Sequence, residues 1–371
     1  MMTNDQKKYL IFYFAAFIAV MTGACSLKLQ KFDVETPAQV LSTVGSPPVL
    51  DGRLQFRQIF CALLEEVTDA SSEAQNCTSF IWRLSDEKIN ESSGGEIPHH
   101  DPGLKIFIVP GAFSDCFPEL GAPFQKGIER LRDLGYSIDT IAVEGRSGSE
   151  RDAHLIAEAL SRKIDRETDR LLLIGYSKGI TDILHFLVDF PDLANQVAAV
   201  ISVSGAVNGS PLAEKLSNLY EEWFANALAS RCPPGDSKVL ISLERKVQMA
   251  WLASHVLPRH VAYFSLATFT DRPHVARILC TTYDQLAQID PRNDGQLIFY
   301  DQIIPGSTLL GFANTDHWDI ALPVRQKYRF WGIPAVLPEF TEFPKDVLLE
   351  ALVLFSIEQL QDAQIMKKRL Q

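Results

Sequence analysis

From Lys105 onward, short apolar runs alternate with stretches in which apolar residues recur every three or four positions. Each run has the length of a strand and is rich in aliphatic and β-branched residues, as expected of strands buried on both faces. Alternation of such strands with amphipathic helices is typical of an α/β fold: a mostly parallel sheet with helices on both faces. The expected strands are Ile106–Val109, Ile138–Val143, Leu171–Ile174, Val197–Val203, Val261–Leu266 and Leu309–Phe312.

Helical spacing marks the segments between these strands. We expect one helix up to Gly135, one around Ile156–Ile164, and one that follows Ile174 and stops at Pro191. A final helix is expected over Pro344–Gln361.

A segment of about residues 208–258 departs from this alternation. It holds two expected helices between two strands, so it is placed where a helical cap is inserted into such folds. The apolar residues of these helices are Leu212, Leu216, Leu219, Trp223 and Phe224 in the first and Val247, Trp251 and Leu252 in the second.

The amino-terminal part divides into two segments ahead of a main domain at 104–371. Lys7 and Lys8 precede an apolar run, Tyr9–Met21, which is short for a bilayer span but fits the core of a secretory signal, so residues 1–24 are expected to be removed. Residues 25–103 are expected to form an extension, in which Phe56–Leu64 has the spacing of a helix that packs on the domain.

Charge excludes one class of partner. The formal net charge is −11 and no segment is rich in Lys and Arg, whereas binding to nucleic acid needs a concentrated basic face. With 46% hydrophobic and 22% charged residues, the composition is that of an ordinary globular protein.

Export would place the cysteines in an oxidising compartment, where they could pair. Besides Cys25 there are five, so at least one stays out of a disulfide. Proximity in the sequence favours Cys61 with Cys77 and Cys232 with Cys280, which leaves Cys116 unpaired; five buried thiols are the alternative.

A candidate nucleophile lies where an apolar strand runs into a helix, at Gly175-Tyr176-Ser177-Lys178-Gly179. This G-x-S-x-G pattern in that context is typical of a nucleophile elbow, a strained turn that pushes the serine out of the sheet. Gly175 and Gly179 are needed because side chains there would collide with neighbouring backbone. The amide of Lys178, at the start of the helix, can donate a hydrogen bond to an oxyanion.

The serine needs a base, and histidine has the suitable pKa. Of eight histidines, His317 follows the last expected strand in Asn314-Thr315-Asp316-His317-Trp318, at a carboxyl strand end where the sites of open α/β sheets collect.

A carboxylate between Ser177 and His317 should orient the histidine. Asp294 lies in a polar turn with Asn293 and Gly295, and Asp271 closely follows a strand. The residues alone leave both open, and Asp290 and Asp301 are the next candidates.

A second oxyanion donor should come from the loop after the first strand, Val109-Pro110-Gly111-Ala112-Phe113. By position the amide of Ala112 is the better candidate and that of Phe113 the alternative. The chemistry of this set needs no metal and no organic cofactor.

Together these motifs resemble the bacterial lipases and carboxylesterases of the α/β-hydrolase superfamily, over about Lys105 to Ala321. The resemblance rests on the oxyanion loop, the elbow, Asn293-Asp294-Gly295 and Asp316-His317-Trp318-Asp319. It implies Asp294 as the acid, with Asp271 as the alternative. Lys178 departs from the family, in which histidine or glutamine is commoner after the nucleophile.

A second resemblance concerns export. Thr22-Gly23-Ala24-Cys25 is similar to the lipobox of bacterial lipoproteins, although Thr22 stands where leucine is usual. It implies cleavage before Cys25, lipidation of Cys25, and a protein held on a membrane outside the cytoplasm.

The sequence thus predicts a serine hydrolase that cleaves a carboxylic ester, for which the substrate is a small molecule or a lipid. Thioester hydrolysis or acyl transfer by the same residues is one alternative. A catalytically silent, lipid-anchored binding protein is another, because fold alone does not guarantee activity.

Overall fold

The computed structural model of the chain describes residues 48–67, 77–87, 104–118, 122–165, 168–219, 232–323, 329–330, 333–334 and 342–370. The expected signal peptide and Cys25 lie outside these residues. Within the described part of the chain, no helix combines the length and the apolar character that a bilayer span requires.

One eight-stranded sheet organises the molecule. Its order is β1-β8-β7-β6-β5-β3-β4, all neighbours on this path being parallel, and β2 pairs antiparallel with β8. All six strands expected from the apolar runs are confirmed, within a larger mostly parallel sheet. The strands are β1 (Leu50–Asp51), β2 (Ile81–Trp82), β3 (Leu104–Val109), β4 (Ser137–Thr140), β5 (Arg170–Tyr176), β6 (Val197–Val203), β7 (Ala262–Thr268) and β8 (Thr308–Ala313).

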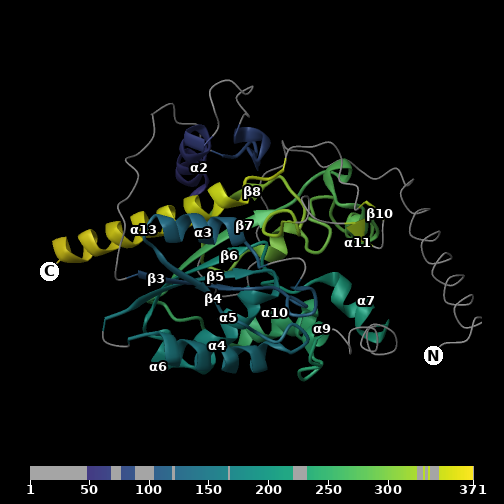
Figure 1. Cartoon of the computed structure of the whole chain (residues 1–371), viewed down its shortest axis with the longest axis horizontal. Coiled ribbons are helices and arrows are strands. Elements are labelled where there is room, and N and C mark those ends of the chain that lie inside the picture. The colour runs from purple at the N-terminus through teal and green to yellow at the C-terminus, as the bar shows by residue number, and fades with distance from the viewer. Residues whose placement is uncertain are drawn as a thin grey trace, which may run out of the picture.

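Helices cover both faces of the sheet (Figure 1). One face carries α2 (Arg53–Val67), α3 (Gln125–Asp133) and α13 (Lys345–Leu370), and the other carries α4 (Ser149–Lys163), α5 (Lys178–Asp189) and α6 (Pro191–Ala194). Away from the sheet lie α11 (Cys280–Leu286) and a small hairpin of β9 (Arg329–Phe330) and β10 (Ile333–Pro334). The α/β class expected from the sequence is therefore confirmed.

Alternate residues of each strand supply two separate cores. In β5, Leu172 and Ile174 join the core with α2, α3 and α13, whereas Leu171 and Leu173 join the core with α4, α5 and α6. All four side chains are fully buried. Period-two alternation with both faces apolar explains why the strand appears in the sequence as an unbroken apolar run.

The segment before the main domain contributes to the same sheet. β1 and β2 both pair with β8, and α2 packs its buried Phe56 and Phe60 into the core shared with α13. The expected helix at 56–64 is thus confirmed within a longer α2. Two strands of two residues each are too short to give a periodic signal in the sequence.

The segment at 208–258 does contain helices between two strands, β6 and β7. They are α7 (Pro211–Leu219), α9 (Val239–Ser242) and α10 (Arg245–Ser254). Trp251 of α10 stacks on His185 of α5, with ring centroids 4.0 Å apart, so this tryptophan packs against the domain. Trp223 and Phe224 lie outside the described residues.

The structure confirms one expected disulfide and corrects the other. Cys61 pairs with Cys77, as expected. The pairing of Cys232 with Cys280 is wrong, because Cys232 pairs with Cys116, 116 positions away. Cys280 instead accepts a hydrogen bond from Arg272 Nη1 at 2.9 Å. Proximity in the sequence failed here because the loop after β3 meets the segment before α9 only in the folded chain.

Candidate active site

Ser177 occupies a strained turn between β5 and α5. Its backbone has φ 55° and ψ −125°, a conformation that costs energy for any residue with a side chain. A Cβ at Gly175 would overlap the backbone of Ile180, and one at Gly179 would overlap the carbonyl oxygen of Val109. The two glycines therefore allow the sharp turn, in agreement with the reason that the sequence suggested.

The structure brings Ser177, His317 and Asp294 together although they are far apart in the chain. His317 Nε2 lies 2.9 Å from Ser177 Oγ, and His317 Nδ1 lies 2.8 Å from Asp294 Oδ2. Asp294 is fully buried, His317 is 5% exposed, and Ser177 is partly exposed. A base that contacts a hydroxyl and is itself oriented by a carboxylate can accept the proton of that hydroxyl.

Asp294 is a buried carboxylate surrounded by hydrogen-bond donors. Oδ1 accepts from the amides of Gln296 and Leu297 at 2.9 and 2.7 Å, and Oδ2 accepts from side chains. Burial alone would raise the pKa of Asp294, but the charge of His317 and these hydrogen bonds hold that pKa below its ordinary value. The group is therefore suited to remain an anion beside the histidine.

Asp271, the alternative acid, lies elsewhere. Its side chain is 45% exposed and hydrogen-bonded to His274. Asp294 is the acid that the structure brings to His317.

The loop of His317 is held by hydrogen bonds to the backbone of His317. The His317 amide donates to the Asp294 carbonyl at 2.9 Å, and the Tyr176 hydroxyl donates to the His317 carbonyl at 2.6 Å. Because Tyr176 immediately precedes the serine, the elbow itself helps to fix the histidine.

The segments expected to supply the two oxyanion donors both adjoin Ser177. A Cβ at Gly111 would stand 2.8 Å from Ser177 Cβ, so the loop after β3 passes directly against the serine. The Phe113 amide donates to the Gly145 carbonyl at 2.8 Å, which leaves Ala112 as the better donor from this loop. Lys178 starts α5, where backbone amides and the helix dipole favour an anion.

The Lys178 side chain turns away into the protein, which the sequence did not foresee. Its Nζ lies 2.7 Å from Asp152 Oδ2 and 2.6 Å from Asp182 Oδ1, and all three side chains are buried. Burial disfavours the ammonium, but the charges of Asp182 and Asp152 keep the pKa of Lys178 above its ordinary value. The residue that departs from the family pattern thus forms a buried ion cluster behind the elbow.

Three further polar residues were missed by the sequence analysis. Ser204, Thr268 and Gln302 all donate to Asp294 Oδ2, at 2.6, 2.8 and 3.3 Å. Ser204 and Thr268 stand at the carboxyl ends of β6 and β7, a position that could have marked them.

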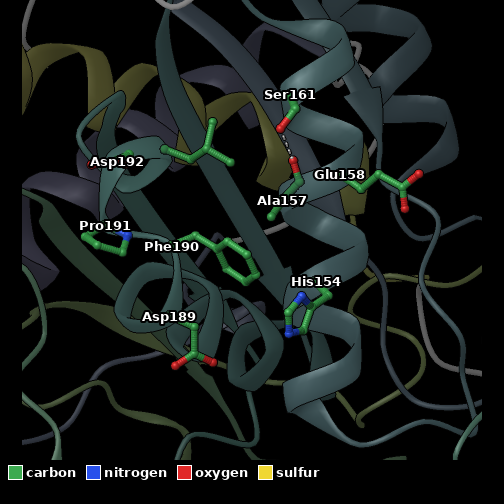
Figure 2. Close-up of a pocket in the computed structure, with 9 residues that line it drawn as sticks. His154, Ala157, Glu158, Ser161, Asp189, Phe190, Pro191 and Asp192 are labelled. Carbon is green, nitrogen blue, oxygen red and sulfur yellow. Dashed lines mark hydrogen bonds between the residues drawn. The ribbon is translucent and has the colours of Figure 1, made fainter.

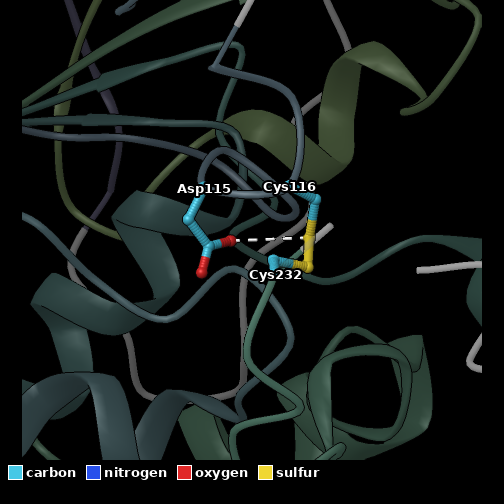
Figure 3. A group of neighbouring side chains, drawn as sticks. All are labelled: Asp115, Cys116 and Cys232. Carbon is cyan, nitrogen blue, oxygen red and sulfur yellow. Dashed lines mark hydrogen bonds between the residues drawn. A yellow bond between two sulfur atoms is a disulfide. The ribbon is translucent and has the colours of Figure 1, made fainter. Parts of the chain in front are cut away.

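One group in the described residues has the compactness of a metal site: Asp115, Cys116 and Cys232 (Figure 3). The two sulfurs are joined in the disulfide, so neither is a thiolate ligand. Asp115 instead accepts from the Gly145 amide at 3.1 Å, and this bond ties the oxyanion loop to its neighbour.

A hollow of about 550 Å³ lies between α4 and the turn from α5 to α6 (Figure 2). His154, Glu158, Asp189 and Asp192 line it, together with small and apolar neighbours. Ser177 precedes α5 and Asp189 ends it, so the 12 residues of that helix, at about 1.5 Å each, separate the hollow from the serine by roughly 18 Å. The hollow is therefore distinct from the Ser177 site.

No protein-family model matches the chain, and no curated protein matches it either. Among solved structures, the chain is similar to a metagenomic carboxyl esterase, with 33% sequence identity, a TM-score of 0.77, and coverage of 88% of this chain and 97% of that one. Its likeness to the mature form of a lipase from Bacillus licheniformis is lower: 20% identity, a TM-score of 0.47, and coverage of 60% and 89%. Lipase 1 from Pelosinus fermentans shares 12% identity at a TM-score of 0.48, with coverage of 70% and 99%.

Proposed function

Since the chain belongs to the carboxyl esterases of α/β-hydrolase type, we propose that it hydrolyses a carboxylic ester with Ser177 as nucleophile, His317 as base and Asp294 as the orienting acid. The observation that carries this proposal is the continuous hydrogen-bonded row from Ser177 Oγ through His317 to Asp294 Oδ2.

In the first half-reaction, Ser177 Oγ attacks the ester carbonyl carbon while His317 Nε2 accepts the hydroxyl proton. The amides of Ala112 and Lys178 stabilise the negative oxygen of the tetrahedral intermediate. As the intermediate collapses, the carbon–oxygen bond to the leaving group breaks, and His317 returns its proton to the departing alcohol. An acyl group remains on Ser177.

In the second half-reaction, a water molecule gives its proton to His317 and attacks the acyl carbon. Collapse releases the carboxylic acid, and the proton on His317 returns to Ser177 Oγ. Asp294 stays ionised throughout and stabilises the imidazolium that forms twice in each cycle.

The test is turnover of a short p-nitrophenyl ester, combined with labelling by a fluorophosphonate probe, which modifies activated serines. Wild-type protein should turn over the ester and take up the probe, whereas Ser177→Ala should lose both, with kcat falling by several orders of magnitude. Ser254→Ala, at the exposed end of α10, is the matched control and should behave as wild type. Turnover retained by Ser177→Ala would overturn the nucleophile, and a wild type that neither turns over ester nor labels would indicate a silent hydrolase fold.

Location is a separate part of the proposal. The lipobox-like Thr22–Cys25 after an apolar run supports export and lipidation of Cys25, and the cysteine pairs Cys61–Cys77 and Cys116–Cys232 suit an oxidising compartment. In a bacterial host, Cys25→Ala should release the protein from the membrane fraction or leave it unprocessed. An unmodified mature amino terminus at a residue other than Cys25, found by mass spectrometry, would contradict lipidation.

A further inference from the structure

Ser204 lies at the centre of the hydrogen bonds around the acid. Its Oγ stands 2.6 Å from Asp294 Oδ2, which is the shortest of the side-chain contacts to that oxygen, and 3.1 Å from His317 Nδ1. The side chain is fully buried.

The protons in this cluster can all be directed toward Asp294. Ser204 Oγ and Thr268 Oγ1 lie 2.6 Å apart, and each has one proton, which it can donate to Asp294 Oδ2. Gln302 holds Thr268 in place, because its Oε1 accepts from the Thr268 amide at 2.7 Å and its Nε2 donates to the Thr268 carbonyl at 2.9 Å. Ser204, Thr268 and Gln302 thus all donate to the carboxylate oxygen that faces the histidine.

The backbone at Ser204 is also constrained. Its φ is 47°, a left-handed conformation that a residue with a side chain rarely adopts and that costs conformational energy. The turn it forms after β6 touches the elbow, since the Ser177 amide donates to the Val203 carbonyl and the Ala206 amide to the Ser177 carbonyl. Glycine would relieve the backbone cost, but it would remove the hydroxyl.

We propose that Ser204 is a positioning residue of the proposed ester hydrolysis: its hydroxyl fixes the Asp294 carboxylate opposite His317 Nδ1 and favours the ionised form. This inference rests on the proposed function. The Ser204 hydroxyl is hydrogen-bonded to Asp294 and to His317, so it acts through these two residues.

The test compares Ser204→Gly and Ser204→Ala with wild type. Both variants lose the hydroxyl, and only glycine relieves the left-handed backbone. If the hydroxyl positions Asp294, both variants should lower kcat by about tenfold or more with KM unchanged, whatever their melting temperatures. Ser265→Ala is the matched control, because Ser265 is equally buried in β7 and bonds to Ser307 rather than to Asp294. It should keep the wild-type kcat.

A double-mutant cycle with Asp294→Asn identifies the route of the effect. In the Asp294→Asn background, adding Ser204→Gly should have little further effect on kcat. The rate of fluorophosphonate labelling should also change little, and this rate can be measured in variants whose turnover is too slow to follow. A wild-type kcat in Ser204→Gly, or the same fold-loss in both backgrounds, would overturn the positioning role. If Ser177→Ala is inactive while Ser204→Gly equals wild type, this inference alone fails; an active Ser177→Ala removes the proposed function itself.

Discussion

Asp271 is hydrogen-bonded to His274, three residues further along the chain, whereas Asp294 is hydrogen-bonded to His317. Two aspartates that were equally reasonable by their position in the sequence are therefore engaged by different histidines. Only Asp294 is buried beside the base that contacts Ser177.

We expect Asp294→Asn to lower kcat by at least about a thousandfold, because an amide can neither fix the histidine tautomer nor stabilise the imidazolium. Asp271→Asn should stay within about tenfold. Steady-state kinetics on the same p-nitrophenyl ester, with circular dichroism to show that both variants fold, checks the ranking. The reverse order would transfer the orienting role to Asp271.

A second prediction concerns the two disulfides. Cys116 belongs to the loop that carries Ala112, so we expect Cys116→Ala/Cys232→Ala to loosen an oxyanion donor and to lower kcat by about tenfold at a temperature where the variant stays folded. In the chain-entropy model it should also lose more stability than Cys61→Ala/Cys77→Ala. In that model, a disulfide that closes a loop of about 100 residues stabilises the folded state by about 4.7 kcal/mol, and one that closes about 15 residues by about 3 kcal/mol.

The Cys61→Ala/Cys77→Ala variant is the control, since that disulfide joins α2 to the segment before β2. Its kcat should match wild type. Equal losses of kcat in the two double variants would show that disulfides act here only through global stability.

The pH dependence of stability provides a third prediction. Burial is the largest effect on Asp301 and raises its pKa to about 7, although Arg245 Nε donates to Oδ1 at 3.1 Å. A free aspartate titrates near 3.9, so between about pH 4 and 7 the unfolded chain gives up this proton while the folded chain keeps it. The contribution of Asp301 to stability therefore falls as pH rises across that window, with a slope of at most about 1.4 kcal/mol per pH unit.

Asp301→Asn should flatten this part of the profile. Urea unfolding at a series of pH values between 4 and 7 measures the slope for both proteins. Identical slopes would mean that Asp301 titrates alike in the folded and unfolded chains.

Most strands of the sheet could be predicted because they are apolar on both faces. In Val197–Val203, every residue is aliphatic except Ser202, so the run stands out in the sequence although apolar and polar residues do not alternate. β1 and β2 could not be predicted in the same way. Each has only two residues, and these are strands only because they pair with β8, which is a tertiary contact.

The residues of the candidate site also differ in whether the local sequence marks them. Ser177 and His317 have local signals, a strained turn and a strand end, and the structure places them 2.9 Å apart. Ser204 has no motif around it. Its importance arises from a contact with Asp294, 90 positions away, that exists only when β6 and the loop after β7 lie side by side. The pairing of Cys116 with Cys232 was missed for the same reason.

The Cys116–Cys232 disulfide also closes a covalent ring that contains the elbow and begins four residues after Ala112. Ala112 lies just before Cys116, and the elbow with Lys178 lies between Cys116 and Cys232. A protease that cuts the chain once anywhere between these cysteines produces two fragments that stay on one molecule. Nicked protein would then differ from intact protein by the mass of only one water molecule until a reductant separates the pieces, and the parts needed to rebuild the site would stay together.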